Sequence, residues 1–125
     1  MGEPRGKFAI RSKIWLENDR GGVVLGPGRM RMLAAIEEHG SLNAAAKAMS
    51  MSFRALWARM ESTEKRMGEK LLVRSAGGSH GGGSELTEAG KALVRDFREL
   101  EKKAEKAVSE LFKASPLYRD VPDGE

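Results

Sequence analysis

Cysteine is absent from this chain of 125 residues, and histidine occurs only twice, as His39 and His80. Without a thiol there is no disulfide framework, no thiolate nucleophile, and no zinc or iron–sulfur site held by cysteine. Two unrelated histidines do not suggest a metal site, and no nucleophile with a neighbouring base is evident. We therefore expect no bound metal, no cofactor and no enzymatic activity.

Long apolar runs are also missing. None approaches the roughly 20 residues that a membrane-spanning helix needs, and the first residues, MGEPRGKFAI, lack the apolar segment of a secretory signal. We expect a cytoplasmic protein with no membrane partner. Hydrophobic residues make up 40% of the chain and charged residues 32%, which is typical of a folded domain, and the length favours one domain with a modest core.

Positive charge is concentrated in the first part of the chain. The formal net charge is +4, and residues 21–75 hold nine lysines and arginines against five acidic residues. Residues 85–113 hold seven of each. An excess of cations on one part of a small protein favours a polyanionic partner.

The first 26 residues are predicted to form an extension built on a β-hairpin. Residues 8–16 nearly alternate between apolar and polar side chains, which predicts a half-buried strand. Asn18–Gly22 is a turn sequence, and Val23–Leu25 can return as the second strand.

Three helices are predicted next, over residues 29–39, 42–49 and about 52–67. Gly40 is a C-terminal stop for the first, while Ser41 and Ser52 are N-caps for the second and third. The inner face of the third helix carries Leu56, Met60, Thr63 and Met67 at helical spacing. Two short helices joined by a tight turn form a helix-turn-helix pattern, although an ordinary helical hairpin in a core has the same pattern.

The start of the third helix carries the candidate base-reading side chains. Together with the phosphate contact expected of Arg59, the candidate DNA-contacting residues of this helix are Ser52, Phe53, Arg54, Ala55, Ala58 and Arg59. The start of such a helix can enter the major groove of DNA, where arginine pairs with guanine O6 and N7. Arg54 is the favoured base reader and Arg59 a phosphate contact, while Trp57 is expected to pack against the core. Arg29 and Arg31 are further candidates for backbone contact or for a solvated face.

A strand, a glycine-rich loop and a second strand follow, over residues 71–73, 76–84 and 85–87. A helix-turn-helix followed by this order of elements is a winged helix, and glycine lets the wing approach a phosphate backbone closely. The candidate wing contacts are Arg74, Ser75, Gly78, Ser79, His80 and Gly81. The loop does not match a nucleotide-binding loop, because it has no lysine and no helix follows directly.

A long helix, capped by Thr87, is predicted over residues 88–113, followed by a flexible tail over 114–125. The first half of the apolar stripe on this helix is expected to pack against the domain core. A second copy of the chain would cover the rest of the stripe. The candidate dimerisation residues are Leu93, Phe97, Leu100, Ala104, Val108 and Leu111. The predicted fold is mainly α with a small β component: an N-terminal hairpin, a winged helix-turn-helix domain over 27–87, and a dimerisation helix.

Residues 25 to about 100 resemble the N-terminal DNA-binding domain of the ModE family of molybdate-responsive repressors, which are related to LysR-type regulators. The resemblance is carried by LGPGR at 25–29, GS at 40–41, AAA at 44–46, SFRALW at 52–57, LV at 72–73, GGSHGGG at 77–83 and LTEAG at 86–90. It implies a homodimer paired through long helices, with a recognition helix in each major groove and the wings beside them.

Three departures from the family pattern bear on function. Ser50 and Met51 form the helix–helix turn where a glycine is frequent, and Glu85 stands where a small residue is usual. The molybdate-binding region of the family has no counterpart here, so we expect no molybdate sensing within this chain. The expected function is a sequence-specific transcriptional regulator that binds double-stranded DNA as a homodimer on an inverted repeat. The alternative is a protein–protein dimerisation module that partners a longer regulator without its own DNA readout.

Overall fold

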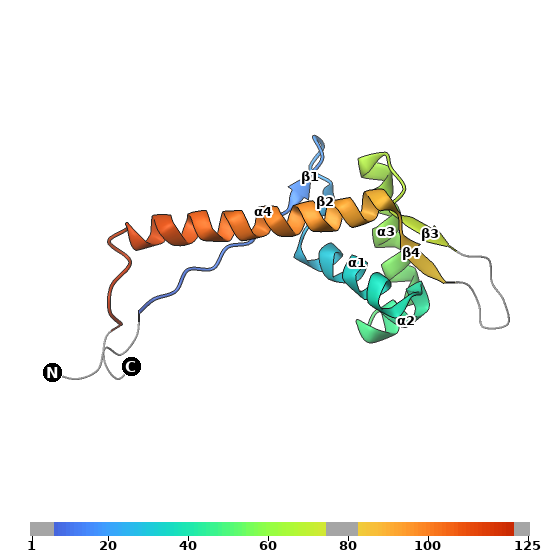
Figure 1. The fold of residues 1–125 in the computed structure, drawn as a ribbon, viewed down its shortest axis with the longest axis horizontal. Coiled ribbons are helices and arrows are strands. Elements are labelled where there is room, and N and C mark those ends of the chain that lie inside the picture. Colours follow the sequence, from blue (N-terminus) through green and yellow to red (C-terminus); the bar gives the residue numbers. More distant parts are fainter. Residues whose placement is uncertain (1–6, 75–82, 122–125) are drawn as a thin grey trace. The chain divides into compact units, whose positions relative to one another are not determined.

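The computed structural model describes residues 7–74 and 83–121, which fall into two compact units. The larger unit spans Ile14–Phe97, and the terminal unit combines Met1–Lys13 with Arg98–Glu125. The elements are β1 (Leu16–Glu17), β2 (Val23–Leu25), α1 (Pro27–His39), α2 (Leu42–Ala48), α3 (Phe53–Met67), β3 (Leu72–Arg74), β4 (Ser84–Leu86) and α4 (Glu88–Lys113), as Figure 1 shows. No helix among these is long and apolar enough to cross a membrane.

The helix ends follow the predicted capping residues closely. Ser41 and Ser52 each accept a hydrogen bond at 3.0 Å from the backbone N–H three residues later, and Thr87 does the same for α4. Gly40 and Gly68 end α1 and α3 with φ angles of 75° and 70°, in the left-handed region that glycine adopts without strain. α1 begins two residues earlier than predicted, because a proline with its fixed φ is well suited to the first helical position.

The core of the larger unit lies where α1, α2 and α3 meet. Leu33, Ile36 and Leu56 are completely buried, and Ala45 is equally buried on α2. Small alanine side chains let the helix backbones approach closely, as the helix-turn-helix pattern requires. The predicted inner face of α3 is confirmed: Leu56, Met60 and Thr63 are buried, and Met67 is partly buried and packs against the core.

The wing strands pair antiparallel in the predicted order but begin and end one residue away from the predicted bounds. Leu72 pairs with Leu86, and Arg74 pairs with Ser84. The N–H of Ser84 also donates to the carbonyl of Gly40 at 2.8 Å, so β4 is held directly to the end of α1. The base of the wing is thereby fixed to the helices of its own unit.

The prediction of a strand over residues 8–16 is wrong. Only Leu16 and Glu17 form β1, which pairs with β2, and Phe8 and Ile10 are exposed. Alternation predicts a strand only where a neighbouring strand supplies hydrogen bonds and a core covers one face. β2 is three residues long and has no room to pair with the earlier residues.

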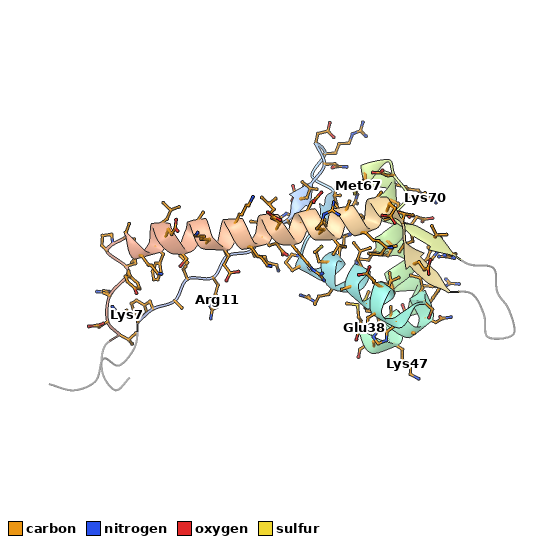
Figure 2. All side chains as sticks on the ribbon, in the orientation of Figure 1. Lys7, Arg11, Glu38, Lys47, Met67 and Lys70 are labelled. Carbon is orange, nitrogen blue, oxygen red and sulfur yellow. The ribbon has the colours of Figure 1, made fainter. Side chains whose placement is uncertain are left out.

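The terminal unit joins the N-terminal arm to the chain beyond α4. Lys7 forms an isolated antiparallel bridge with Asp120, and its Nζ lies 4.8 Å from the centre of the Tyr118 ring. Tyr118 packs edge-on against Phe112 at 5.5 Å. The predicted flexible tail over residues 114–125 makes these ring and charge contacts as far as Asp120. Lys7 and Arg11 mark the course of the arm in Figure 2.

Candidate nucleic-acid interface

The beginning of α3 presents a short, exposed and cationic surface. Leu56 and Met60 anchor the helix in the core, so Arg54 and Ala58 lie on its outer side and are exposed. Phe53 is 40% exposed, although it is a large apolar residue. The cap at Ser52 occupies one backbone N–H of the first turn, and the turn contains no acidic residue. The positive end of the helix dipole and the Arg54 guanidinium therefore lie together at this end of α3.

The six predicted DNA-contacting residues share this end of α3. Ser52, Phe53, Arg54, Ala58 and Arg59 are exposed, and Ala55 is partly buried. Lys47 on the preceding helix projects outward as well, as Figure 2 shows. An exposed helix start that carries arginine, hydroxyl and small side chains has the side-chain types that pair with base edges in a major groove.

Trp57 and Arg74 join α3 to the base of the wing. Trp57 packs against the core, as predicted, and the guanidinium carbon of Arg74 lies 5.4 Å from the centre of its ring. An arginine over an indole face is attracted by the ring quadrupole. Arg74 is therefore held beside α3 while it remains exposed on β3.

Glu64 fixes the connection between α3 and β3, a role that the sequence reasoning missed. Its Oε2 accepts hydrogen bonds from the N–H groups of Leu71 at 2.8 Å and Leu72 at 3.1 Å. A hollow of about 260 Å³ lies beside this joint, between Trp57 and Arg74. The sequence does not reveal this role, because the partners of the Glu64 carboxylate are backbone N–H groups, which every residue except proline has.

The other predicted wing contacts lie outside the described residues. Ser75, Gly78, Ser79, His80 and Gly81 all belong to the segment between β3 and β4. The two strands that bracket this segment are described, so the positions where the wing leaves and rejoins the larger unit are known.

The predicted dimerisation residues of α4 separate into two groups. Phe97 is only 6% exposed within the core of the larger unit, and Leu93 packs against that core. In the terminal unit Leu100 is 53% and Leu111 is 72% exposed, while Ala104 and Val108 are partly buried. The core thus uses the first part of the stripe, and the later leucines remain uncovered.

Residues 27–91 match the sequence profile of the bacterial regulatory helix-turn-helix proteins of the LysR family. The match covers α1, α2 and α3, both wing strands and the first turn of α4. The chain belongs to the LysR family. This result agrees with the winged helix-turn-helix fold predicted from the sequence.

Named relatives of this LysR-family chain include two ModE proteins. It is 40% identical over 90 residues to the molybdenum transport protein ModE of Azotobacter vinelandii, covering 72% of this chain and 33% of that protein. It is 37% identical over 81 residues to the transcriptional regulator ModE of Haemophilus influenzae, covering 65% and 32% respectively. The predicted resemblance to ModE is therefore confirmed, and the chain spans about a third of the length of these relatives.

A solved structure supports the same fold for this LysR-family chain. The DNA-binding domain of CbnR in complex with DNA is 30% identical and superposes with a TM-score of 0.54, covering 70% of this chain and 94% of that domain. The superposition therefore includes nearly the whole of the CbnR DNA-binding domain.

A second group of cations lies along α3 in this LysR-family domain, away from the wing. Arg29, on the first turn of α1, donates from Nε to Thr63 Oγ1 at 2.8 Å and from Nη2 to Ser62 Oγ at 3.0 Å. Arg66 donates from Nη1 to the carbonyl of Val23 at 2.6 Å. Burial and, next, the positive charge of Arg66 and of Arg59 lower the pKa of the Arg29 guanidinium. Arg29, a candidate for backbone contact or a solvated face, is thus bonded within the protein.

Proposed function

We propose that this chain is a DNA-binding transcriptional regulator that acts as a homodimer on an inverted-repeat site. The observation that carries the proposal is the exposed, cationic start of α3, anchored by a buried inner face within a LysR-family winged helix. The similarity to a domain solved in complex with DNA supports the same function. Because the proposed target is double-stranded DNA and the family is one of transcriptional regulators, we place the protein in the cytoplasm and assign it no catalytic step.

In this proposal the residues at the start of α3 determine the DNA sequence specificity. Arg54 pairs with guanine in the major groove, and Phe53 contacts a thymine methyl group. The remaining base-reading positions are Ser52, Ala55 and Ala58, while Arg59 contacts phosphate. The affinity comes largely from lysine and arginine side chains that displace condensed counterions from the duplex.

The wing supplies contacts to the DNA backbone in the same proposal. Arg74 is the described member of this set, and its stacking on Trp57 supports a fixed position beside α3. The others are Ser75, Gly78, Ser79, His80 and Gly81. Such contacts set the orientation of the protein on the duplex without selecting its sequence.

Dimerisation in this proposal uses the exposed part of α4. Leu100 and Leu111 are exposed apolar residues on this helix, and a second copy would cover them. Two-fold symmetry then requires half-sites about 34 Å apart, or a multiple of that spacing. The names of the ModE relatives suggest target genes connected with molybdenum, while molybdate binding is not assigned to this chain.

The test begins with selection of duplexes from a random library, followed by measurement of affinity for the selected site and for random DNA. Arg54→Ala should weaken binding to the selected site by about 1–3 kcal/mol and reduce the preference over random DNA. Lys106→Ala, which removes an exposed lysine of α4, is the control and should keep the preference. Selection of no preferred duplex would overturn the proposal, and a stable complex with a longer regulator in place of DNA binding would support the dimerisation module instead.

A further inference from the structure

A stripe of side chains on α3 connects the proposed DNA-reading end to the N-terminal hairpin. Ser52, Ala55, Arg59, Ser62 and Arg66 recur at three- and four-residue spacings and therefore share one side of the helix. This side is distinct from the one that faces the wing, where Trp57 and Glu64 make their contacts.

Arg29 adds a third guanidinium to this stripe from another helix. Its hydrogen bonds to Ser62 and Thr63 place it between Arg59, one turn before, and Arg66, one turn after. The Ser62 hydroxyl in turn donates to the carbonyl of Arg59 at 3.0 Å. Three arginines from two helices therefore lie along one short length of α3, close enough for the charges of Arg59 and Arg66 to act on Arg29.

No carboxylate among residues 7–74 and 83–121 forms an ion pair with any of these three arginines. Arg29 also lies in the first turn of α1, which contains no acidic residue, although a helix N-terminus favours negative charge. The cluster therefore combines mutual repulsion with an unfavourable helix dipole. An anion bound between the guanidinium groups would relieve both.

The cluster retains hydrogen-bond donors for such an anion. A guanidinium has five N–H donors, and Arg29 uses its Nε and one donor of Nη2 within the protein. Arg66 uses Nη1, and the Arg59 side chain has no acceptor in the described part of the chain. Arg59 and Arg66 are exposed, so their free donors can be reached from solvent.

Hydrogen bonds fix the position of two of the three guanidinium groups. Arg29 is held by α3, and Arg66 is held by Val23 on β2. A Cβ added at Gly22 would lie 2.7 Å from Arg66 Nε, so glycine at this position lets the guanidinium lie against the hairpin backbone. Fixed guanidinium groups lose less entropy on binding than free ones do.

We propose that Arg29, Arg59 and Arg66 form a phosphate-binding site on the hairpin side of α3. A phosphate group fits because its tetrahedral oxygens accept several charge-assisted hydrogen bonds from arginine forks. The group comes from the backbone of DNA that flanks the base-reading contact, or from a free tetrahedral oxyanion. The DNA source rests on the proposed function, since the stripe begins at the proposed DNA-reading end.

The test uses the full chain with Arg59→Gln and Arg66→Gln, singly and together. Arg29 is left unchanged because its hydrogen bonds within the core make it a structural residue. Lys65→Gln is the matched control, since it removes one exposed cation from the same turn of α3 at about 100° around the helix from Arg66. Circular dichroism and thermal unfolding show whether each variant folds, and Arg59→Gln removes no hydrogen bond within the described structure.

The first measurement is the salt dependence of affinity for a long duplex that extends beyond the selected site. The double variant should bind about tenfold more weakly, and the slope of log K against log salt should become shallower by about 1 to 2. The loss should be equal on selected and random sequences, because phosphates carry no sequence information. This result supports the site with DNA as the source.

The second measurement titrates inorganic phosphate into the DNA-free protein and follows the arginine Nε–H signals by NMR. Saturable shifts at Arg59 and Arg66 that vanish in the double variant, with an unchanged DNA slope, support the site with a free oxyanion as the source. Unchanged DNA affinity together with no saturable phosphate response overturns the proposal. If the wild-type chain binds no DNA at all, the proposed function fails, while the phosphate titration still decides whether the site exists.

Discussion

Arg29 Nε lies 2.8 Å from Thr63 Oγ1 and donates a hydrogen bond that joins the first turn of α1 to the last turns of α3. The Thr63 hydroxyl in turn donates a hydrogen bond to the carbonyl of Val24 on β2 at 2.9 Å. One hydroxyl group therefore connects α1, α3 and the N-terminal hairpin. These two hydrogen bonds, together with apolar packing, connect the residues before α1 to the winged helix.

The first prediction concerns this buried hydroxyl. Thr63 is 0% exposed, and Thr63→Val keeps its shape while leaving the Val24 carbonyl without its donor. The free energy of unfolding should fall by about 1–3 kcal/mol, as is typical when a buried polar partner is removed. Urea unfolding measures this change. Thr63→Ser keeps the hydroxyl and is the control, so a loss as large as that of the valine variant would show that packing rather than the relay is responsible.

The second prediction explains the glycine in the LTEAG sequence. A Cβ added at Gly90 would lie 2.5 Å from the carbonyl oxygen of Leu71, and this oxygen already accepts the Thr87 N–H at 2.9 Å. Backbone on both sides prevents relaxation, so Gly90→Ala should destabilise the fold by about 1–3 kcal/mol.

Gly28→Ala is the matched control for that substitution. Gly28 also lies in the first turn of a helix, but an added Cβ meets nothing within 4 Å. Alanine has the higher helix propensity, so this variant should be stabilised by up to about 1 kcal/mol. Chemical unfolding measures the change in the free energy of unfolding for both variants. If the two changes had the same sign, the close approach of α4 to the chain before β3 would not explain the glycine at position 90.

Much of this fold could be predicted because the signals are local. Caps at Ser41 and Ser52 and the glycine stops at Gly40 and Gly68 depend on residues within one turn, and these bounds were close to the observed ones. The turn after α2 places Ser50 at a φ of 55°, a left-handed conformation that glycine adopts more readily than serine does.

The features that sequence reasoning missed depend on partners far along the chain. Arg29 meets Thr63 across 34 positions, and Arg66 meets Val23 across 43. Nothing in a local pattern distinguishes such an arginine from a solvated one. The same limit explains the strand predicted over residues 8–16, since alternation is local but the strand partner that it needs is not.

The third prediction separates the stability of α3 from its proposed contact with DNA. Ser52→Ala removes the cap that accepts the Ala55 N–H and should cost about 0.5–2 kcal/mol of folding stability. Ser52→Asp keeps a capping oxygen and adds a charge that favours the helix N-terminus, so its thermal stability should match that of wild type.

DNA affinity should rank these two variants in the opposite order. At a temperature where both are folded, the aspartate places a negative charge at the proposed DNA-reading end and should weaken duplex binding more than alanine does. Gel shifts at two salt concentrations measure the difference, and it should shrink as salt screens the repulsion. Equal binding by both variants would place Ser52 away from the DNA.

The fourth prediction concerns the exposed stripe of α4. Leu111 is 72% exposed, so Leu111→Asp should leave the fold of one chain intact. In a symmetric dimer the substitution affects two leucines, and losing about 1.5 kcal/mol for each should weaken self-association by about 100-fold or more. Sedimentation equilibrium measures this constant directly.

Lys106→Asp also introduces an aspartate, on the other side of α4 about 140° around the helix from Leu111, and it lowers the net charge by two units where Leu111→Asp lowers it by one. Lys106 is exposed and outside the apolar stripe, so this variant should associate as wild type does. An equal effect of the two substitutions would point to net charge as the cause. Wild-type protein that sediments as a monomer even at high concentration would remove the homodimer from the proposed function, and with it the requirement that the DNA site be an inverted repeat.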